Sequence, residues 1–322
     1  MSTPFSSALP TRAFGPTNLQ VTEMCVGCAP LGDMPETFAY GVSEEQALAT
    51  LRAAFAGPIN FLDTAASYGD GESERRIGLA LRELGGLPAG VVLATKADRD
   101  PKTGDFSGEQ TRRSVERSLK LLGLDRLQVV FLHDPEHATF EEIMATGGAV
   151  ETLLRLKEQG VIGHVGIAGG PVDLMIRYVE TGQFEALITH NRYTLLNRSA
   201  APLLDSAAQR GLAVLNAAPY GSGILAKGPS NYPRYAYQEA DPQMLERAFA
   251  LEAICARNNV PLGAAALQFA LRDPRVTSTI IGISKPERIA QTLELAQQPI
   301  PDAVWQELAS VPYDTVDPEA AR

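Results

Sequence analysis

The sequence has few cysteines: three among 322 residues. An odd number in a long chain argues against a disulfide framework and favours a reducing compartment, so we expect a cytoplasmic protein. Cys25 and Cys28 form a C-x-x-C pair, but a zinc site would need two more soft ligands at compact spacing, and none follow. Because the pair lies in a strand-like segment, VTEMCVGCA, we expect strand packing and no metal site.

Long apolar runs and basic clusters are also missing. No apolar segment approaches the length of a membrane-spanning helix, so we expect no membrane partner. The 28 Lys and Arg residues are outnumbered by 38 Asp and Glu, and no basic stripe is present, so nucleic acid is not expected as a partner. The first residues, MSTPFSSALPTRAF, lack the basic and apolar regions of a signal peptide.

A G-x-G-x-x-G motif is absent after the first predicted strand, which disfavours a doubly wound dinucleotide-binding sheet. Instead, eight apolar segments typical of strands buried on both faces are each followed by a helical segment. The predicted strands are 21–28, 59–63, 91–97, 127–134, 163–169, 184–190, 212–218 and 277–283. The alternation predicts an α/β protein with one (β/α)₈ TIM-barrel domain over residues 1–322. A β-hairpin around GPTN is expected to precede the barrel, and an extra helix at 302–310 to follow it.

The stretch Ile59–Gly78 carries the first candidate site residues. It starts as a strand and ends in a helix over 73–84, which Ser73 is predicted to cap. Between them lie Asp63, an acid that is costly to bury unless paired, and Tyr68 in a glycine-rich turn. In a barrel the active site lies at the carboxyl ends of the strands. The other polar residues near predicted strand ends are Lys96, His133, Asp134, His190, Asn191, Asn216, Tyr220, Ser284 and Lys285.

Four of these residues together suit proton transfer to a carbonyl oxygen. A free phenol titrates near pH ~10, and a Lys96 ammonium beside Tyr68 would lower that value. Asp63 can hold the lysine, and His133 can donate to the substrate oxygen. Each residue alone is better explained as a solvated loop group, but the combination favours catalysis. No side chain supplies a hydride, so the reaction needs a bound cofactor.

The chain resembles the aldo-keto reductases. The resemblance rests on DTAASYGDGESERRIG around Asp63 and Tyr68, ATK ending at Lys96, FLHDP at His133 and IIGISKPERIAQT near Ser284. It covers nearly the whole chain. It implies that Asp63, Tyr68, Lys96 and His133 form the catalytic tetrad, with Tyr68 as the acid or base. It also implies a nicotinamide cofactor that lies across the mouth of the barrel.

Several segments are similar to one branch of this family. CAPLGDM, HDPE, RYTLL and NAAPYGSGIL resemble the D-threo-aldose 1-dehydrogenase group, which includes L-fucose dehydrogenases; pyridoxal 4-dehydrogenase and L-galactose dehydrogenase are similar. The resemblance implies oxidation of an aldose of the L-fucose or D-arabinose type to a lactone, with Tyr68 accepting the hemiacetal proton. Two alternatives stay open. One is an NADPH-dependent carbonyl reductase acting on an aldehyde, an oxidised sugar or pyridoxal, and the other is a cofactor-binding regulatory subunit without turnover.

The expected contacts to the nicotinamide depart from the family pattern. The usual Ser-Asn after the fifth strand reads Ala168-Gly169 here, and His190 takes the place of a common Gln. Ala217 takes the place of the tyrosine that usually stacks on the ring. We expect Asn216 or Tyr220 to substitute for the missing contacts.

At the adenosine end, Ser284 and Arg288 match the residues usual in the family. The family's lysine is replaced by Ile283, and Lys285 follows two positions later. This loss weakens the case for binding a 2′-phosphate, so NAD is slightly favoured over NADP.

The long loop after the seventh strand is expected to cover the cofactor pyrophosphate. Backbone N–H groups near Ser222, Gly223 and Leu225 are predicted to bind phosphate oxygens. The loop also contains tyrosines that either line a pocket or anchor the loop, namely Tyr232, Tyr235 and Tyr237. Another wall is expected from Met34, Phe38 and Tyr40.

Overall fold

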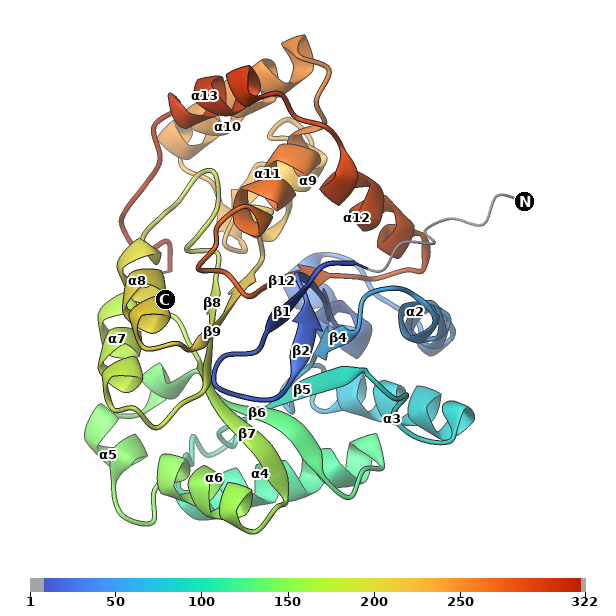
Figure 1. Cartoon of the computed structure of the whole chain (residues 1–322), viewed down its shortest axis with the longest axis vertical. Coiled ribbons are helices and arrows are strands. Elements are labelled where there is room, and N and C mark those ends of the chain that lie inside the picture. Colours follow the sequence, from blue (N-terminus) through green and yellow to red (C-terminus); the bar gives the residue numbers. More distant parts are fainter. Residues whose placement is uncertain (1–8, 320–322) are drawn as a thin grey trace.

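The computed structural model describes residues 9–319 and confirms the predicted barrel (Figure 1). Eight parallel strands are hydrogen-bonded in the closed order β12-β3-β4-β5-β6-β7-β8-β9. These strands are β3 (Met24–Gly27), β4 (Phe61–Asp63), β5 (Val92–Ala97), β6 (Leu127–His133), β7 (Ile162–Ala168), β8 (Ala186–His190), β9 (Ala213–Ala217) and β12 (Ser278–Gly282). The expectation of no signal peptide rests largely on residues 1–8, which lie outside the described residues, as do residues 320–322.

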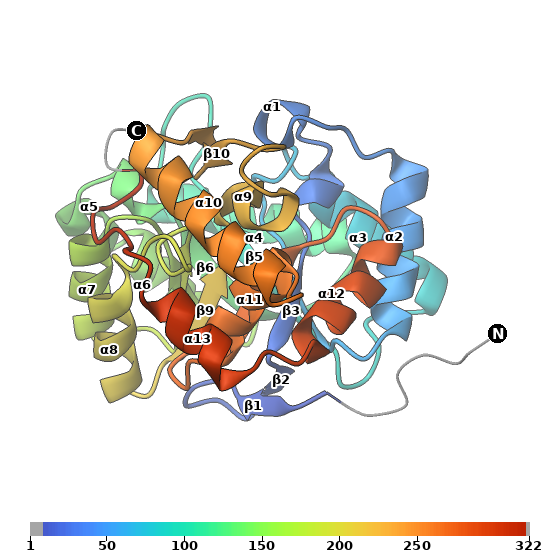
Figure 2. The same ribbon diagram turned by 90° about the horizontal axis from the view of Figure 1, so that it is seen from above.

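Helices form a ring around these strands, and α10 and α13 pack together on one side of it (Figure 1 and Figure 2). The longer helices are α2 (Glu44–Ala56), α3 (Glu72–Leu84), α4 (Gly108–Leu122), α6 (Ala149–Glu158), α7 (Val172–Glu180), α8 (Ala201–Gln209), α10 (Pro242–Arg257), α11 (Leu262–Leu271), α12 (Glu287–Gln297) and α13 (Asp302–Ala309). The extra C-terminal helix is therefore confirmed as α13. Within residues 9–319, no helix combines the length and the apolar character needed to cross a membrane.

The predicted N-terminal hairpin closes one end of the barrel. Strands β1 (Thr11–Ala13) and β2 (Gln20–Thr22) pair antiparallel, and Figure 1 shows them crossing the barrel end that faces the viewer. The loop between them buries Phe14 completely, with its ring edge-on to Phe61 at 5.7 Å between centroids. The hairpin thus seals the amino-terminal end of the barrel, which leaves the carboxyl ends of the strands for the site.

Side chains alternate between the barrel interior and the helices, as the period of two in a strand requires. On β5, Val92 and Ala94 belong to the apolar cluster inside the barrel, and Lys96 continues the same face. On β6, Val129 and Phe131 precede His133 in the same way. The apolar interior therefore ends in polar groups at the mouth of the barrel.

One predicted helix start is wrong in detail. Helix α3 begins after Gly71, whose φ of 88° suits a glycine, and Ser73 gives no capping hydrogen bond. The Ser73 hydroxyl instead donates to the Cys28 carbonyl at 2.9 Å and lies 2.8 Å from Thr64 Oγ1. Ser73 is turned inward because it joins the first turn of α3 to the ends of β3 and β4.

The loops at the mouth contain short elements that the sequence pattern did not predict. They are α1 (Pro35–Phe38), α5 (Phe140–Met144), α9 (Ile224–Lys227), the antiparallel pair β10 (Arg234–Tyr235) and β11 (Gln238–Glu239), and single 3₁₀ turns at Ala29–Gly32, Pro135–His137 and Gly221–Gly223. Helices α1 and α9 lie in the two loops that border the site.

Candidate active site

The structure brings Asp63, Tyr68 and Lys96 into direct contact. The Lys96 ammonium donates to Asp63 Oδ2 at 2.6 Å, to the Thr64 carbonyl at 2.7 Å and to the Tyr68 hydroxyl at 3.1 Å. Asp63 and Lys96 are each only 2–3% exposed. All three donor positions of the ammonium are therefore used, and one of them is directed at the phenol.

Burial and pairing act in opposite directions on these groups. Burial alone would lower the pKa of Lys96, but the Asp63 carboxylate and the Tyr68 oxygen raise that pKa above its usual range. Burial also raises the pKa of Tyr68 well above its usual range, against the lowering effect of the Lys96 charge. At neutral pH, Lys96 is therefore an ammonium and Tyr68 carries its proton.

His133 stands beside this trio. Its ring lies edge-on to the Tyr68 ring, with 6.0 Å between centroids and 86° between planes. Burial alone would lower the pKa of His133, but the carboxylates of Asp134 and Asp98 raise it to about 9. The nearest contact is from His133 Nδ1 to Asp98 Oδ1 at 2.7 Å.

Asp98 was not predicted from the sequence, although a signal was present. It lies two residues after Lys96, so it follows the inward face of β5 beyond the end of the strand. Its second carboxylate oxygen accepts from the Ser67 backbone N–H at 2.8 Å. His133 and its neighbours lower the pKa of the Asp98 carboxyl, although burial opposes the shift.

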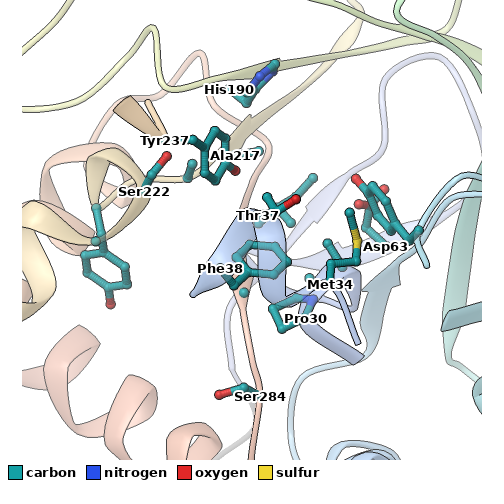
Figure 3. Close-up of a pocket in the computed structure, with 18 of the residues that line it drawn as sticks. Pro30, Met34, Thr37, Phe38, Asp63, His190, Ala217, Ser222, Tyr237 and Ser284 are labelled. Atoms are coloured by element: carbon teal, nitrogen blue, oxygen red, sulfur yellow. The ribbon is translucent and has the colours of Figure 1, made fainter. Parts of the chain in front are cut away.

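A cavity of about 820 Å³ opens above the four predicted residues. Asp63, Tyr68, Lys96 and His133 all line it. A second wall comes from the loop after β3 and α1, and a third from the loop after β9; the expected wall residues Met34, Phe38 and Tyr40, and Tyr232 and Tyr237, all lie there. Figure 3 shows His190 at one end of this cavity and Ser284 at the other, with Phe38 and Tyr237 between them.

Two loops meet over the cavity through aromatic contacts. The Phe38 ring lies edge-on to the Tyr237 ring at 6.3 Å between centroids. The Lys227 ammonium lies 4.2 Å from the centroid of the Tyr232 ring and 5.9 Å from that of Tyr40. By contrast, Tyr235 is buried away from the cavity, where its hydroxyl donates to the Asn191 carbonyl at 2.6 Å. Of the three loop tyrosines, Tyr235 is therefore the anchor.

Most of the residues predicted to contact a cofactor lie on the cavity wall, namely Tyr220, Ser222, Gly223, Ser284, Lys285 and Arg288. The Ser222 hydroxyl donates to Asn191 Oδ1 at 2.9 Å, which fixes its orientation. Lys227, which the sequence did not single out, joins them. Burial and the nearby positive charge of Arg288 both lower the pKa of Lys227.

Two predicted contact residues do not reach the cavity. Asn216 is fully buried and donates to the Tyr193 carbonyl at 2.9 Å, because it lies one position out of register with the inward-facing Leu215 and Ala217. Leu225 is fully buried in an apolar cluster under α9, and its backbone N–H donates to the Tyr220 carbonyl at 3.1 Å. Neither group is positioned to contact a ligand in the cavity.

Asp317 and Glu319 reach the β8 side of the cavity, which the sequence did not indicate. Glu319 Oε2 lies 3.0 Å from His190 Nε2 and 2.8 Å from Arg192 Nη1. Asp317 adds a second ion pair to Arg192 at 2.7 Å. The acidic tail thus holds both the cavity-lining histidine and a buried arginine.

Comparison with known proteins supports the family resemblance. The sequence model of the Aldo/keto reductase family matches residues 23–312. A D-threo-aldose 1-dehydrogenase from a Pseudomonas species is 31% identical over 315 residues, covering 90% of this chain and 94% of that protein. A pyridoxal 4-dehydrogenase from Microbacterium luteolum is 31% identical over 336 residues, covering 93% and 96%. These relatives belong to the branch that the sequence motifs indicated.

The fold has a solved counterpart. An aldo-keto reductase from Bacillus halodurans, in its holo form, matches with a TM-score of 0.78, covering 98% of this chain and 99% of that chain. The two sequences are 22% identical, so this likeness supports the barrel and says nothing about substrate.

Proposed function

The chain belongs to the aldo/keto reductase family of oxidoreductases, and we propose that it oxidises the anomeric carbon of an aldose of the L-fucose or D-arabinose type to a lactone. The observation that carries the proposal is the contact of Tyr68 with Lys96 at 3.1 Å on the wall of a cavity of about 820 Å³. A volume of ~300–1,000 Å³ is usual for small-ligand sites. The aldose dehydrogenase among the relatives supports the substrate class.

In this proposal Tyr68 is the catalytic acid–base group. Oxidation requires the phenolate, which takes the proton of the sugar hydroxyl, and the Lys96 ammonium stabilises that form. Asp63 holds Lys96 protonated and in place. Since burial raises the pKa of Tyr68, we expect oxidation to accelerate as the pH rises.

A nicotinamide dinucleotide, when bound, supplies the acceptor for the hydride. Lys227, Lys285 and Arg288 line one end of the cavity, and among residues 9–319 none of the three has a carboxylate partner. This uncompensated positive charge fits phosphate groups. We propose that these residues, with Ser222 and Ser284, hold the cofactor.

We propose NAD as the preferred form, because the position of the family's lysine is Ile283, which is buried and uncharged. We also place the protein in a reducing compartment such as the cytoplasm. Cys25, Cys28 and Cys255 are buried free thiols, and burial raises the pKa of the Cys255 thiol to about 11, which keeps it unreactive.

The proposal is tested by initial rates of reduced-cofactor formation with L-fucose, D-arabinose, L-galactose and pyridoxal, each with NAD⁺ and NADP⁺. We expect the aldoses to be oxidised and NAD⁺ to be the better cofactor. Absence of activity with every sugar, together with NADPH consumption by aldehydes, would reject the aldose dehydrogenase assignment.

The role of Tyr68 is tested by Tyr68→Phe. Turnover should fall by ~10²–10⁴-fold, the usual contribution of a general acid–base group, while cofactor affinity is retained. Tyr178→Phe is the matched control, since Tyr178 is a fully buried tyrosine that does not line the cavity. Equal turnover in the two variants would show that Tyr68 is not the acid–base group.

A carbonyl reductase using NADPH is the second candidate, and one observation favours it. Because burial raises the pKa of Tyr68, its hydroxyl form predominates at neutral pH, which suits proton donation to a carbonyl oxygen. The aromatic walls that contain Phe38 and Tyr237 would also accept an aromatic aldehyde such as pyridoxal. Rates in both directions at neutral pH separate the two candidates.

A further inference from the structure

Asp98 occupies a position that joins two parts of the site. One carboxylate oxygen lies 2.7 Å from His133 Nδ1, and the other accepts the Ser67 backbone N–H at 2.8 Å. Ser67 immediately precedes Tyr68, so the same carboxylate contacts the histidine and the turn that carries the tyrosine.

Asp98 is itself held firmly. Its backbone N–H donates to the Ser114 hydroxyl at 3.0 Å, and its carbonyl accepts from the Gln110 side chain at 3.2 Å. Both partners lie on α4, and the carboxylate side chain is 15% exposed. A side chain fixed in this way has a defined geometry toward its neighbour.

The contact defines the protonation of the His133 ring. An ionised carboxylate only accepts hydrogen bonds, so His133 Nδ1 must carry a hydrogen that it donates to Asp98. Nε2 is then the nitrogen that gains or loses a proton. It lies 3.6 Å from the Asp134 carboxylate.

The charges around His133 favour its protonated form. The anions are Asp98 and Asp134, with Asp63 further away behind Lys96. The Lys96 ammonium opposes them, and the Tyr68 ring is neutral while its hydroxyl is protonated. The His133 pKa of about 9 reflects this balance, in which two carboxylates outweigh burial and one ammonium.

We propose that Asp98 is a positioning residue that keeps His133 as an imidazolium and aligns it with Tyr68, so that a charged Nε2–H donor faces the reacting oxygen of the substrate. A charged donor stabilises negative charge that develops on that oxygen more strongly than a neutral one. The proposal rests on the function proposed above and adds that the substrate oxygen binds between Tyr68 and His133, which both line the cavity. The imidazolium is present below its midpoint and is lost as the pH rises through about 9.

The test is Asp98→Asn, which keeps the shape of the side chain and removes its charge. Nuclear magnetic resonance follows the titration of the histidine rings, with His133→Gln identifying the His133 signal. We expect His133 to titrate well above the ordinary value of ~6.5 in the wild type, and its midpoint to fall by ~1–3 pH units in Asp98→Asn. In the reduction direction, which needs both Tyr68 and His133 protonated, the alkaline limb of kcat/KM should move to lower pH with it.

The matched control is Asp100→Asn, which removes one carboxylate from the same loop. The Asp100 carboxylate accepts from the backbone N–H groups of Lys102 and Thr103 in its own turn. We expect it to leave the His133 midpoint unchanged. An equal shift in the two variants would mean that general charge, and not the Asp98 contact, sets the protonation.

The ring titration needs no substrate, so it separates the two proposals. If His133 shifts as expected but no aldose is oxidised, the assigned substrate fails and the role of Asp98 stands. If aldoses are oxidised and the midpoint does not move, the role of Asp98 is refuted. Should Asp98→Asn fail to fold, a wild-type His133 that titrates in the ordinary range refutes it on its own.

Discussion

The two sides of the barrel mouth are built differently. At the ends of β4, β5 and β6 stand Asp63, Lys96 and His133. The first two are buried, and each of the three contacts a partner from this chain at hydrogen-bond distance. At the ends of β7 and β9 the inward positions are Ala168 and Ala217, and the cavity-lining cations Lys227, Lys285 and Arg288 have no carboxylate partner among residues 9–319. On the first side the charged groups already have partners within the protein, whereas the second side provides space and unpaired positive charge for a ligand.

This difference separates chemistry from binding. A group that gains or loses a proton during the reaction must have its pKa and geometry set before the substrate binds, because reorganisation during the reaction raises the activation barrier. A binding surface gains affinity when its charges find their partner only in the ligand. Substitutions on the first side should therefore affect stability and turnover together, and those on the second side mainly affinity.

Lys96→Met should have the largest effect, because it removes one partner of a buried ion pair. The Asp63 carboxylate would remain 3% exposed without its cation, and loss of one partner typically costs ~3–5 kcal/mol of unfolding free energy. Turnover should fall along with stability, since Tyr68 loses the ammonium that contacts its hydroxyl. Urea unfolding and steady-state rates measure both effects.

The double variant Asp63→Leu/Lys96→Met separates these two losses. Replacement of both charges by apolar groups is often neutral for stability, so we expect unfolding free energy to recover while turnover does not. Recovery of turnover would contradict the role given to Lys96. An unstable double variant would instead show that the pair is needed for folding.

The fold and the chemical side of the site could be predicted because they depend on local periodicity. Apolar strand segments indicated the barrel, and polar residues at their ends indicated Asp63, Lys96 and His133. The same reasoning failed for Asn216, because successive residues of a strand face opposite sides and Asn216 lies between the inward-facing Leu215 and Ala217. Which of the two alternating sets faces inward depends on strand pairing in the closed barrel, which a single sequence does not reveal.

The missed residues depend on contacts between distant parts of the chain. Asp98 could have been found from the period of two that it shares with Lys96. Lys227 lies in a short helix that forms only inside the long loop after β9. Glu319 meets Arg192 across 127 positions, so no local pattern could have paired them. The single-domain assignment stays a prediction.

Arg288→Leu should have an intermediate effect, confined to affinity. Arg288 lines the cavity beside Lys227, and both are part of the proposed phosphate-binding end. Loss of one charge-assisted contact should weaken NADP⁺ binding by about tenfold, or ~1.4 kcal/mol, with a smaller loss for NAD⁺. Fluorescence titration measures both values. Glu287→Gln is the control on the same turn, since Glu287 does not line the cavity.

Equal weakening of both cofactors would place Arg288 near a phosphate that they share. Unchanged binding of both would remove it from the cofactor site. The unfolding free energy of Arg288→Leu should equal that of the wild type, because substitutions on the binding side of the mouth are expected to leave stability unchanged. With that condition met, either result refines the contrast between the two sides.

Glu319→Gln should have the smallest effect, because Arg192 keeps Asp317 as a partner. The buried guanidinium pairs with both carboxylates, at 2.8 Å and 2.7 Å, so loss of one charge should cost roughly 1 kcal/mol, below the ~1.5–3 kcal/mol of an isolated charged hydrogen bond. Asp317→Asn should cost about as much, yet only Glu319 also contacts His190.

Glu319→Gln and Asp317→Asn together therefore show whether the acidic residues near the end of the chain only stabilise the fold or also contribute to the cavity. If cofactor affinity falls by about twofold in Glu319→Gln and not in Asp317→Asn, the tail acts on the cavity through His190. If both variants lose the same stability and neither changes affinity, the acidic tail only fastens the chain end to β8. In that case the contact between Glu319 and His190 would have no part in cofactor binding.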